Sequence, residues 1–142
     1  MPDVHLTGIH HLAFPVSDLG ASIAWYERCL AAARITRFDH HDPDGVVVAV
    51  ILALPGGPLL ELRSDPATAG AVSGYLPVAF GVSDRVDLDR WIAHLDAQGV
   101  EHSEVATRRV GYTVDITSPD GLRLRLYTDP VDGFDAVEFV ET

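Results

Sequence analysis

An eleven-residue stretch of this chain recurs 66 positions later. Residues 8–18 (GIHHLAFPVSD) and residues 74–84 (GYLPVAFGVSD) are identical at six of eleven positions. At the same offset Trp25 falls on Trp91. A spacing kept across a strand-like run and a helical run indicates an internal duplication. The chain is therefore expected to fold as two related modules.

The two copies differ where chemistry could be located. After a deletion of two residues, the later part of the first copy aligns at an offset of 64, which places Pro55 on Pro119. His11 of the first copy is then Pro77 in the second, and Glu61 is Arg125. One module retains two potential metal ligands, and the other has replaced both.

Composition restricts the class of partner. The 142 residues carry a formal net charge of −11, and 47% of them are hydrophobic. A protein that binds nucleic acid or an anionic membrane surface needs a cluster of positive charge, so neither is expected as a partner. Neither a signal peptide nor an apolar run of about 20 residues is seen. With its single cysteine, Cys29, the chain is expected in the cytoplasm, with the thiol packed in the core.

Each copy has the pattern of a βαβββ module. An alternating apolar run over residues 8–16 predicts a strand, and Ser17 and Asp18 offer N-cap oxygens to the helix that follows. In the second copy Ser83 and Asp84 do the same, and Gly99 is a plausible end of the helix. The further strands are expected at about 34–39, 46–54, 58–64, 101–106, 111–117 and 121–128.

This pattern sets the expected domain boundaries. The first module covers residues 1–64, a linker of small and turn-forming residues covers 65–74, and the second module covers 75–128. Residues 129–142 match neither copy and form an acidic C-terminal segment, either a tail or a capping strand. The fold class is α+β.

The chain resembles the vicinal oxygen chelate superfamily in two respects. It has paired βαβββ modules, each with an apolar strand that leads into Val-Ser-Asp, and it has a Pro-Asp-Gly turn at residues 119–121. That group includes glyoxalase I, bleomycin-resistance proteins, fosfomycin-resistance proteins and extradiol dioxygenases. The resemblance covers about residues 7–128. It implies that the modules form a curved mixed sheet around a cup-shaped cavity, commonly within a homodimer.

The resemblance also indicates where a metal ion would bind. Superfamily members that use a metal place ligands on the first and last strands of each module, which here are His11, Glu61, Pro77 and Arg125. A catalytic metal normally has three or four protein ligands. Pro77 has no side-chain donor and Arg125 is a cation, so only His11 and Glu61 remain.

Other histidines are expected to be uninvolved. His10 should point to the opposite face of the strand from His11. His40 and His41 are interpreted as part of a solvated polar turn, although with their acidic neighbours they could hold an adventitious metal. We expect no resident cofactor, with a divalent metal at His11 and Glu61 as the alternative.

Glu61 and Arg125 occupy equivalent strand positions, so three arrangements are open. They could form a buried ion pair inside the cup, or both could be partly buried and hydrated. Alternatively, a free Arg125 could bind an anionic or carbonyl group of a ligand. Arg123 is assigned to a solvent-exposed position off that face. Tyr75 and Tyr127 share the strand parity of Pro77 and Arg125, and are therefore candidates to flank a ligand.

The expected function is metal-independent binding of a small organic molecule, such as an antibiotic or natural product, at His11, Glu61, Tyr75, Arg125 and Tyr127. Two alternatives involve turnover. One is a metal-dependent lyase, isomerase or dioxygenase using His11 and Glu61. The other is a metal-free enzyme with Glu61 as general base and Arg125 stabilising an anion.

Overall fold

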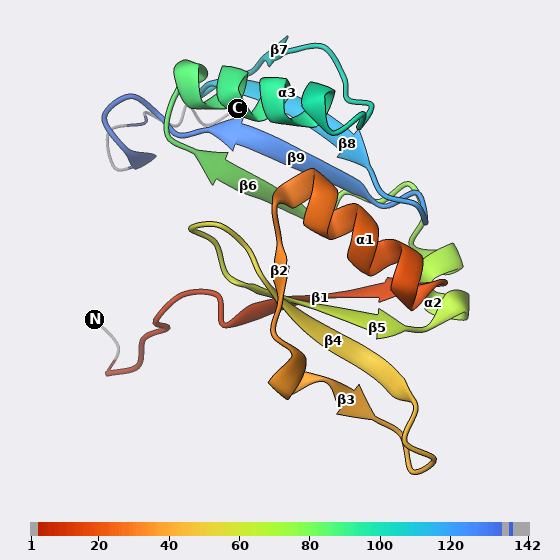
Figure 1. Ribbon diagram of the computed structural model, residues 1–142. Coiled ribbons are helices and arrows are strands. Elements are labelled where there is room, and N and C mark those ends of the chain that lie inside the picture. Colours follow the sequence, from red (N-terminus) through yellow and green to blue (C-terminus); the bar gives the residue numbers. More distant parts are fainter. Residues whose placement is uncertain (1–2, 135–136, 138–142) are drawn as a thin grey trace. The chain divides into compact units, whose positions relative to one another are not determined.

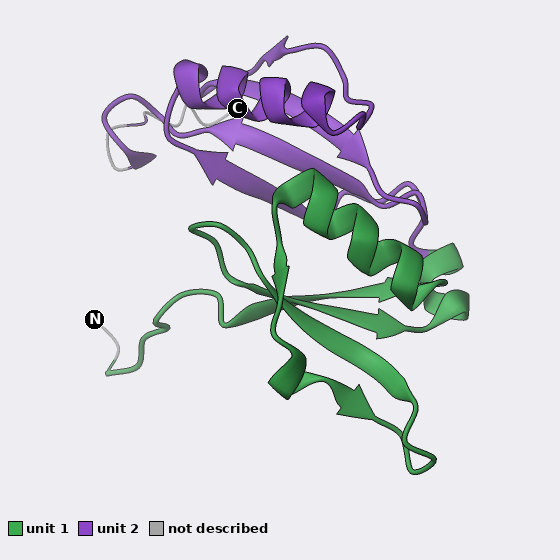
Figure 2. Ribbon diagram, viewed as in Figure 1, with its two compact units in different colours: residues 1–71 green, residues 72–142 purple. Residues whose placement is uncertain are grey.

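The computed structural model describes residues 3–134 and residue 137. It divides the chain into two compact units, residues 1–71 and 72–142 (Figure 2). Each unit has its own mixed sheet. None of the helices in the described residues is long and apolar enough to span a bilayer.

The first unit contains a mixed sheet with β1 at one edge (Figure 1). Its strand order is β1-β5-β4-β2, and β3 also pairs with β4. β1 is parallel to β5, and the remaining pairings are antiparallel. The elements are β1 (His11–Val16), α1 (Leu19–Leu30), β2 (Ala33–Arg34), the 3-10 helix η1 (Thr36–Phe38), β3 (His40–His41), β4 (Val47–Ala53), β5 (Leu59–Ser64) and α2 (Pro66–Ala71).

The second unit repeats this plan with a sheet of order β6-β9-β8-β7. β6 is parallel to β9, and the other pairs are antiparallel. The elements are β6 (Val78–Val82), α3 (Arg85–Ala97), β7 (Ala106–Thr107), β8 (Tyr112–Thr117) and β9 (Arg123–Thr128).

The first and last strands of each unit pair in the same register in both sheets. In the first unit Ala13 pairs with Glu61, and in the second Ala79 pairs with Arg125. The duplicated positions seen in the sequence are thus equivalent in structure. The α+β class, with two mixed sheets and few helices, is confirmed.

In each unit, one face of the sheet is covered by apolar side chains. Leu60 and Leu62 of β5 are fully buried, as are Leu124 and Leu126 of β9 (at most 2% exposed). Tyr26 of α1 is buried and packs near Phe14, with ring centroids 6.2 Å apart. The alternate residues of β5 and β9, among them Glu61 and Arg125, lie on the opposite face.

An aspartate begins each long helix. Asp18 accepts a hydrogen bond from the Ala21 amide (3.0 Å), and Asp84 accepts one from the Asp87 amide (2.9 Å). These bonds satisfy donors that the first helical turn leaves unpaired. At the other end of α3, Gly99 has a φ of +68°, as expected for a glycine that terminates a helix.

Some expected boundaries differ from the structure. The linker expected over 65–74 contains α2, whose Thr68 amide donates to Asp65. The strand expected over 34–39 is divided into β2 and η1, and β7 is much shorter than the strand expected over 101–106. The first strand begins at His11 rather than at residue 8. The prediction for residues 129–142 falls partly outside the described residues, which here are 129–134 and 137.

The capping aspartates lead to a stability prediction. Asp18→Ala or Asp84→Ala should each lower the free energy of unfolding by about 0.5–2 kcal/mol, because an amide donor at the helix start loses its partner. Urea denaturation followed by circular dichroism would measure the change. Asp18→Asn and Asp84→Asn, which keep a capping oxygen, are the matched controls. Equal losses for the alanine and asparagine variants would contradict the capping role.

Candidate functional site

The first unit contains a cavity of about 790 Å³ on the face of its sheet that carries Glu61. Its floor includes Ile51 of β4 with Leu59 and Glu61 of β5. The segment around η1 and β3 provides much of the remaining lining. The other lining residues are His10, His11, Arg37, Phe38, Asp39, His40 and His41.

The strand register brings His11 and Glu61 to one face. In the parallel β1–β5 pair, His11 lies opposite Leu59 and Ala13 lies opposite Glu61. Paired residues of neighbouring strands project to the same side of a sheet, so His11 and Glu61 belong to one face, and both line the cavity. The Glu61 side chain is only 13% exposed.

His10 also lines the cavity, so the expectation that it points away from His11 is wrong. The alternation argument fails because His10 precedes β1 and is not constrained by the strand. Its Nδ1 lies 2.9 Å from Nδ1 of His11. In such a contact one ring nitrogen donates and the other accepts, so the two rings orient each other.

His40 and His41 are both exposed, as expected for a solvated segment, and they also line the cavity. His40 pairs with Ala49 and His41 pairs with Val47, with a register shift between them. One step along β3 thus corresponds to two steps along β4, so Val48 is an extra residue on β4, which is the pattern of a β-bulge. The sequence alone did not indicate this bulge.

Charges around the cavity are largely paired. Asp39 forms a two-point ion pair with Arg34 (2.7 and 3.2 Å), and this pairing raises the pKa of the Arg34 guanidinium. Glu61 has a longer contact with Arg63 (3.4 Å). The Arg37 guanidinium lies over the Phe38 ring, 4.8 Å from its centroid. The cavity thus combines an aromatic ring, imidazoles and two carboxylates, Asp39 and Glu61.

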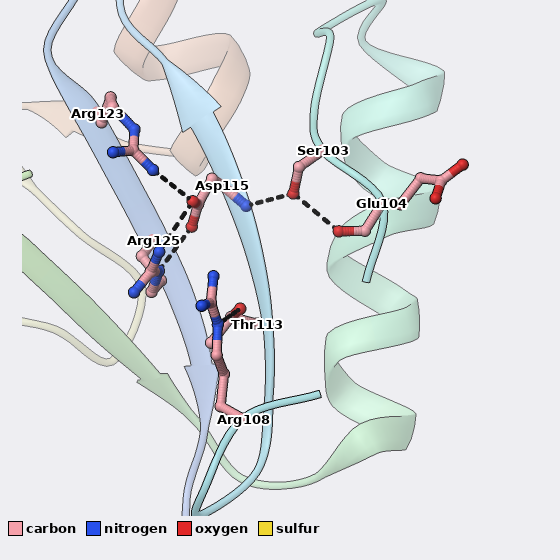
Figure 3. Close-up of polar contacts among 7 residues, drawn as sticks. All are labelled: Ser103, Glu104, Arg108, Thr113, Asp115, Arg123 and Arg125. Carbon is pink, nitrogen blue, oxygen red and sulfur yellow. Dashed lines mark hydrogen bonds and ion pairs between the residues drawn. The ribbon is translucent and has the colours of Figure 1, made fainter. Parts of the chain in front are cut away.

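The equivalent face of the second unit contains a different group (Figure 3). Arg125 donates two hydrogen bonds to Asp115 of β8, at 2.7 and 3.0 Å, and Arg123 donates a third at 2.9 Å. Asp115 and Arg125 are 18% and 20% exposed. Hydrogen bonding from Arg125 lowers the pKa of the Asp115 carboxyl, and the same bonds raise the pKa of Arg125.

Sequence reasoning missed Asp115, and it placed Arg123 on the wrong face, although Arg123 is exposed as expected. Asp115 faces Arg125 across β8 and β9, as Ile51 faces Glu61 across β4 and β5. Extending the internal alignment to residues 51 and 115 would have shown an apolar residue replaced by a carboxylate opposite the new arginine. Arg123 shares the face of Arg125 because two residues separate them on one strand.

Glu61 and Arg125 both have partners inside their own units, Arg63 and Asp115. Neither requires the other to compensate its charge. Tyr127 lines a second cavity of about 450 Å³ in the second unit, together with Phe134 and Val110. Tyr75 is 64% exposed and precedes β6.

The side chains present do not fit a catalytic metal at the superfamily position. Pro77 has no donor atom, and Arg125 is a cation bonded to Asp115. In the part of the chain that the structure describes, no three histidine, cysteine or acidic side chains are close enough to hold an ion.

Cys29 is not a candidate nucleophile. It is fully buried in α1, and burial raises the pKa of its thiol to about 12. The reactive thiolate form is therefore disfavoured. The expectation of a core thiol is confirmed.

Comparison with known proteins gives consistent relatives. A family model described as Glyoxalase/Bleomycin resistance protein/Dioxygenase superfamily matches residues 8–126. Metallothiol transferase FosB of Bacillus licheniformis is 26% identical over 99% of this chain and 86% of its own length.

Solved structures agree at the level of the fold. A glyoxylase/bleomycin resistance protein/dioxygenase domain from Frankia sp. has a TM-score of 0.67 at 21% identity, covering 87% of this chain and 98% of its own. The fosfomycin resistance protein FosX of Listeria monocytogenes, complexed with Mn(II) and 1S,2S-dihydroxypropylphosphonic acid, has a TM-score of 0.63 at 18% identity, covering 87% and 93%. Lactoylglutathione lyase of Agrobacterium tumefaciens has a TM-score of 0.65 at 18% identity, with the same coverage.

The Asp115–arginine cluster leads to a prediction on pH-dependent stability. Asp115→Asn should lower the free energy of unfolding by about 1–3 kcal/mol at neutral pH, because two guanidiniums lose an ionised partner. The lowered pKa of Asp115 in the folded state means that this contribution is present above about pH 4 and disappears as pH falls through the folded-state pKa.

Urea denaturation of both proteins between pH 7 and pH 2 would measure this difference. Asp89→Asn, which affects an exposed i,i+4 pair with Arg85, is the matched control and should change stability by less than about 0.5 kcal/mol. A difference for Asp115→Asn that stays constant down to pH 2 would contradict the assignment.

Proposed function

Because the chain belongs to the Glyoxalase/Bleomycin resistance protein/Dioxygenase superfamily, we propose that it binds a small organic molecule without the metal ion that other superfamily members use. The bound molecule is of the antibiotic or natural-product class, and binding sequesters it. The proposal places the ligand in the cavity of the first unit, against His11 and Glu61.

The cavity is the single observation that carries this proposal. Its volume of about 790 Å³ lies within the range of roughly 300–1,000 Å³ typical of small-molecule sites. Phe38, Ile51 and Leu59 offer apolar and aromatic surface to an organic framework. Glu61, enclosed at the floor, offers a hydrogen-bond acceptor that would fix the orientation of a ligand N–H or O–H group.

The imidazoles define a second side of the cavity. The contact between His10 and His11 holds both rings in place before a ligand arrives, and β3 presents His40 and His41 to the same space. Neutral imidazole both donates and accepts, so these rings suit a ligand with several hydroxyl or carbonyl groups. Preorganised polar groups reduce the entropic cost of binding.

The side chains at two positions of the second unit support binding without a metal ion. Pro77 and Arg125 occupy the positions of two expected ligands, and Arg125 is held by Asp115. Tyr127, which lines the cavity of the second unit, and the exposed Tyr75 remain proposed contacts for the ligand. Assembly as a homodimer and a cytoplasmic location are part of the same proposal.

A metal-dependent lyase, isomerase or dioxygenase is the second candidate. One observation favours it: Glu61 and four histidines line one cavity, although sequence reasoning assigned only His11 and Glu61 to it. FosB, which is 26% identical to this chain, is a metallothiol transferase by name. Metal content separates the two candidates.

A ligand screen provides the first functional test. A thermal-shift screen of natural products and antibiotics should yield compounds that raise the melting temperature. For such a compound, His11→Ala and Glu61→Gln should each weaken binding about tenfold or more by isothermal titration calorimetry, because each removes a lining polar group. His5→Ala is the matched control, since His5 does not line the cavity. Equal affinity for all variants would exclude this cavity as the binding site.

Metal content provides the second test. Protein purified without an affinity tag or chelator should contain well under about 0.1 equivalent of nickel, zinc, iron or manganese by elemental mass spectrometry, because only part of a catalytic ligand set is present. About one equivalent per chain, lost in a His11→Ala variant and kept in His5→Ala, would instead support the metal-dependent enzyme.

A further inference from the structure

Three arginines project from one face of the second sheet. Arg123 and Arg125 lie two residues apart on β9, and Arg108 follows β7. Figure 3 shows the three guanidiniums around Asp115 and Thr113, which lie on the neighbouring strand β8. All of these residues belong to the second unit.

This group carries an excess of positive charge. Asp115 is the carboxylate bonded to Arg123 and Arg125, and Arg108 is bonded instead to the neutral hydroxyl of Thr113 at 3.0 Å. Two of the three cations therefore share one carboxylate, and the third is bonded only to a neutral group. The excess is local, because the chain as a whole has a net charge of −11. Such a concentration of like charge is unfavourable unless an anion joins it.

Many guanidinium donors of the cluster remain available. A guanidinium has five N–H donors. Within the described residues, Arg125 uses its Nε and Nη2 on Asp115, Arg123 uses one Nη2, and Arg108 uses only its Nε. The remaining Nη groups can bind a further acceptor with two or three oxygens. The planar guanidinium matches such an acceptor well because two of its N–H groups can donate to two oxygens at once.

The surrounding contacts hold the cluster in place. Thr113 is only 1% exposed, so its hydroxyl is a fixed anchor for Arg108. Ser103 accepts a hydrogen bond from the Asp115 amide (2.9 Å) and donates one to the Glu104 carbonyl (2.9 Å). The backbone of β8 is thus held at Asp115 by the hydrogen bond to Ser103. The guanidiniums are ordered by protein contacts rather than by an incoming ligand.

From these contacts we infer that Arg108, Arg123 and Arg125 form a binding site for an oxyanion, a carboxylate or phosphate-type group of a small molecule. Asp115 orients the arginines and leaves the site with an excess of positive charge. The inferred site consists of residues of the second unit alone, and it goes beyond the function proposed for the cavity of the first unit. A carboxylate and a phosphate present the same bidentate oxygens, and the experiment below distinguishes them.

The test uses the full chain labelled with 15N and titrated with inorganic phosphate, or with acetate, while sodium chloride keeps the ionic strength constant. The arginine Nε–Hε resonances should shift in a saturable manner with phosphate, with acetate or with both, and the anion that saturates identifies the class. Arg108→Gln and Arg123→Gln should each weaken this binding about tenfold, since each removes one charge-assisted contact.

Asp115→Asn should have the opposite effect. Removing the competing carboxylate leaves three cations for the added anion, so the affinity should rise about tenfold. This sign would not result from general destabilisation. Arg90→Gln, which removes a 75% exposed arginine of α3, is the matched control and should change the affinity less than about twofold.

Two results would overturn the inference. One is a shift that stays linear in both phosphate and acetate and is no larger than that with chloride. The other is an affinity that falls equally in the Arg123→Gln and Arg90→Gln variants. His11→Ala, in the cavity of the first unit, should leave phosphate and acetate binding unchanged, so failure of the proposed function and failure of this site are measured separately.

Discussion

The parallel pairing of the first and last strands of each unit is the constraint on which the functional faces depend. It aligns β1 with β5 and β6 with β9 in the same register, so that Ala13 meets Glu61 and Ala79 meets Arg125. Because alternate residues project to opposite faces, the same register buries the leucines of β5 and β9 on the other side. One pairing therefore positions both the core and the polar face.

On this shared framework the two units have different chemistry. The first keeps an enclosed carboxylate opposite Ile51, inside a cavity lined by imidazoles. The second has an arginine at the equivalent place and a carboxylate at the position of Ile51. Changes at paired positions of neighbouring strands thus replace a carboxylate that faces an apolar side chain with an arginine that faces a carboxylate, without altering the backbone register.

Much of the fold could be predicted from the sequence, because it depends on local and periodic signals. The duplicated segments, the capping aspartates and Gly99 all express such signals, and the structure confirms them. The site was predicted less completely. His11 and Glu61 share one face as strand parity requires. His40 and His41 line the cavity from β3, a two-residue strand whose irregular pairing with β4 has no local sequence signature.

The Asp115–Arg125 pair also limits how this lineage can evolve. A single change from Arg125 to glutamate would place two carboxylates directly opposite each other on β8 and β9, a repulsive arrangement in a partly buried location. Introduction of an acidic side chain at this position would require Asp115 to change first or at the same time. The pair therefore acts as an epistatic barrier to an acidic residue at position 125.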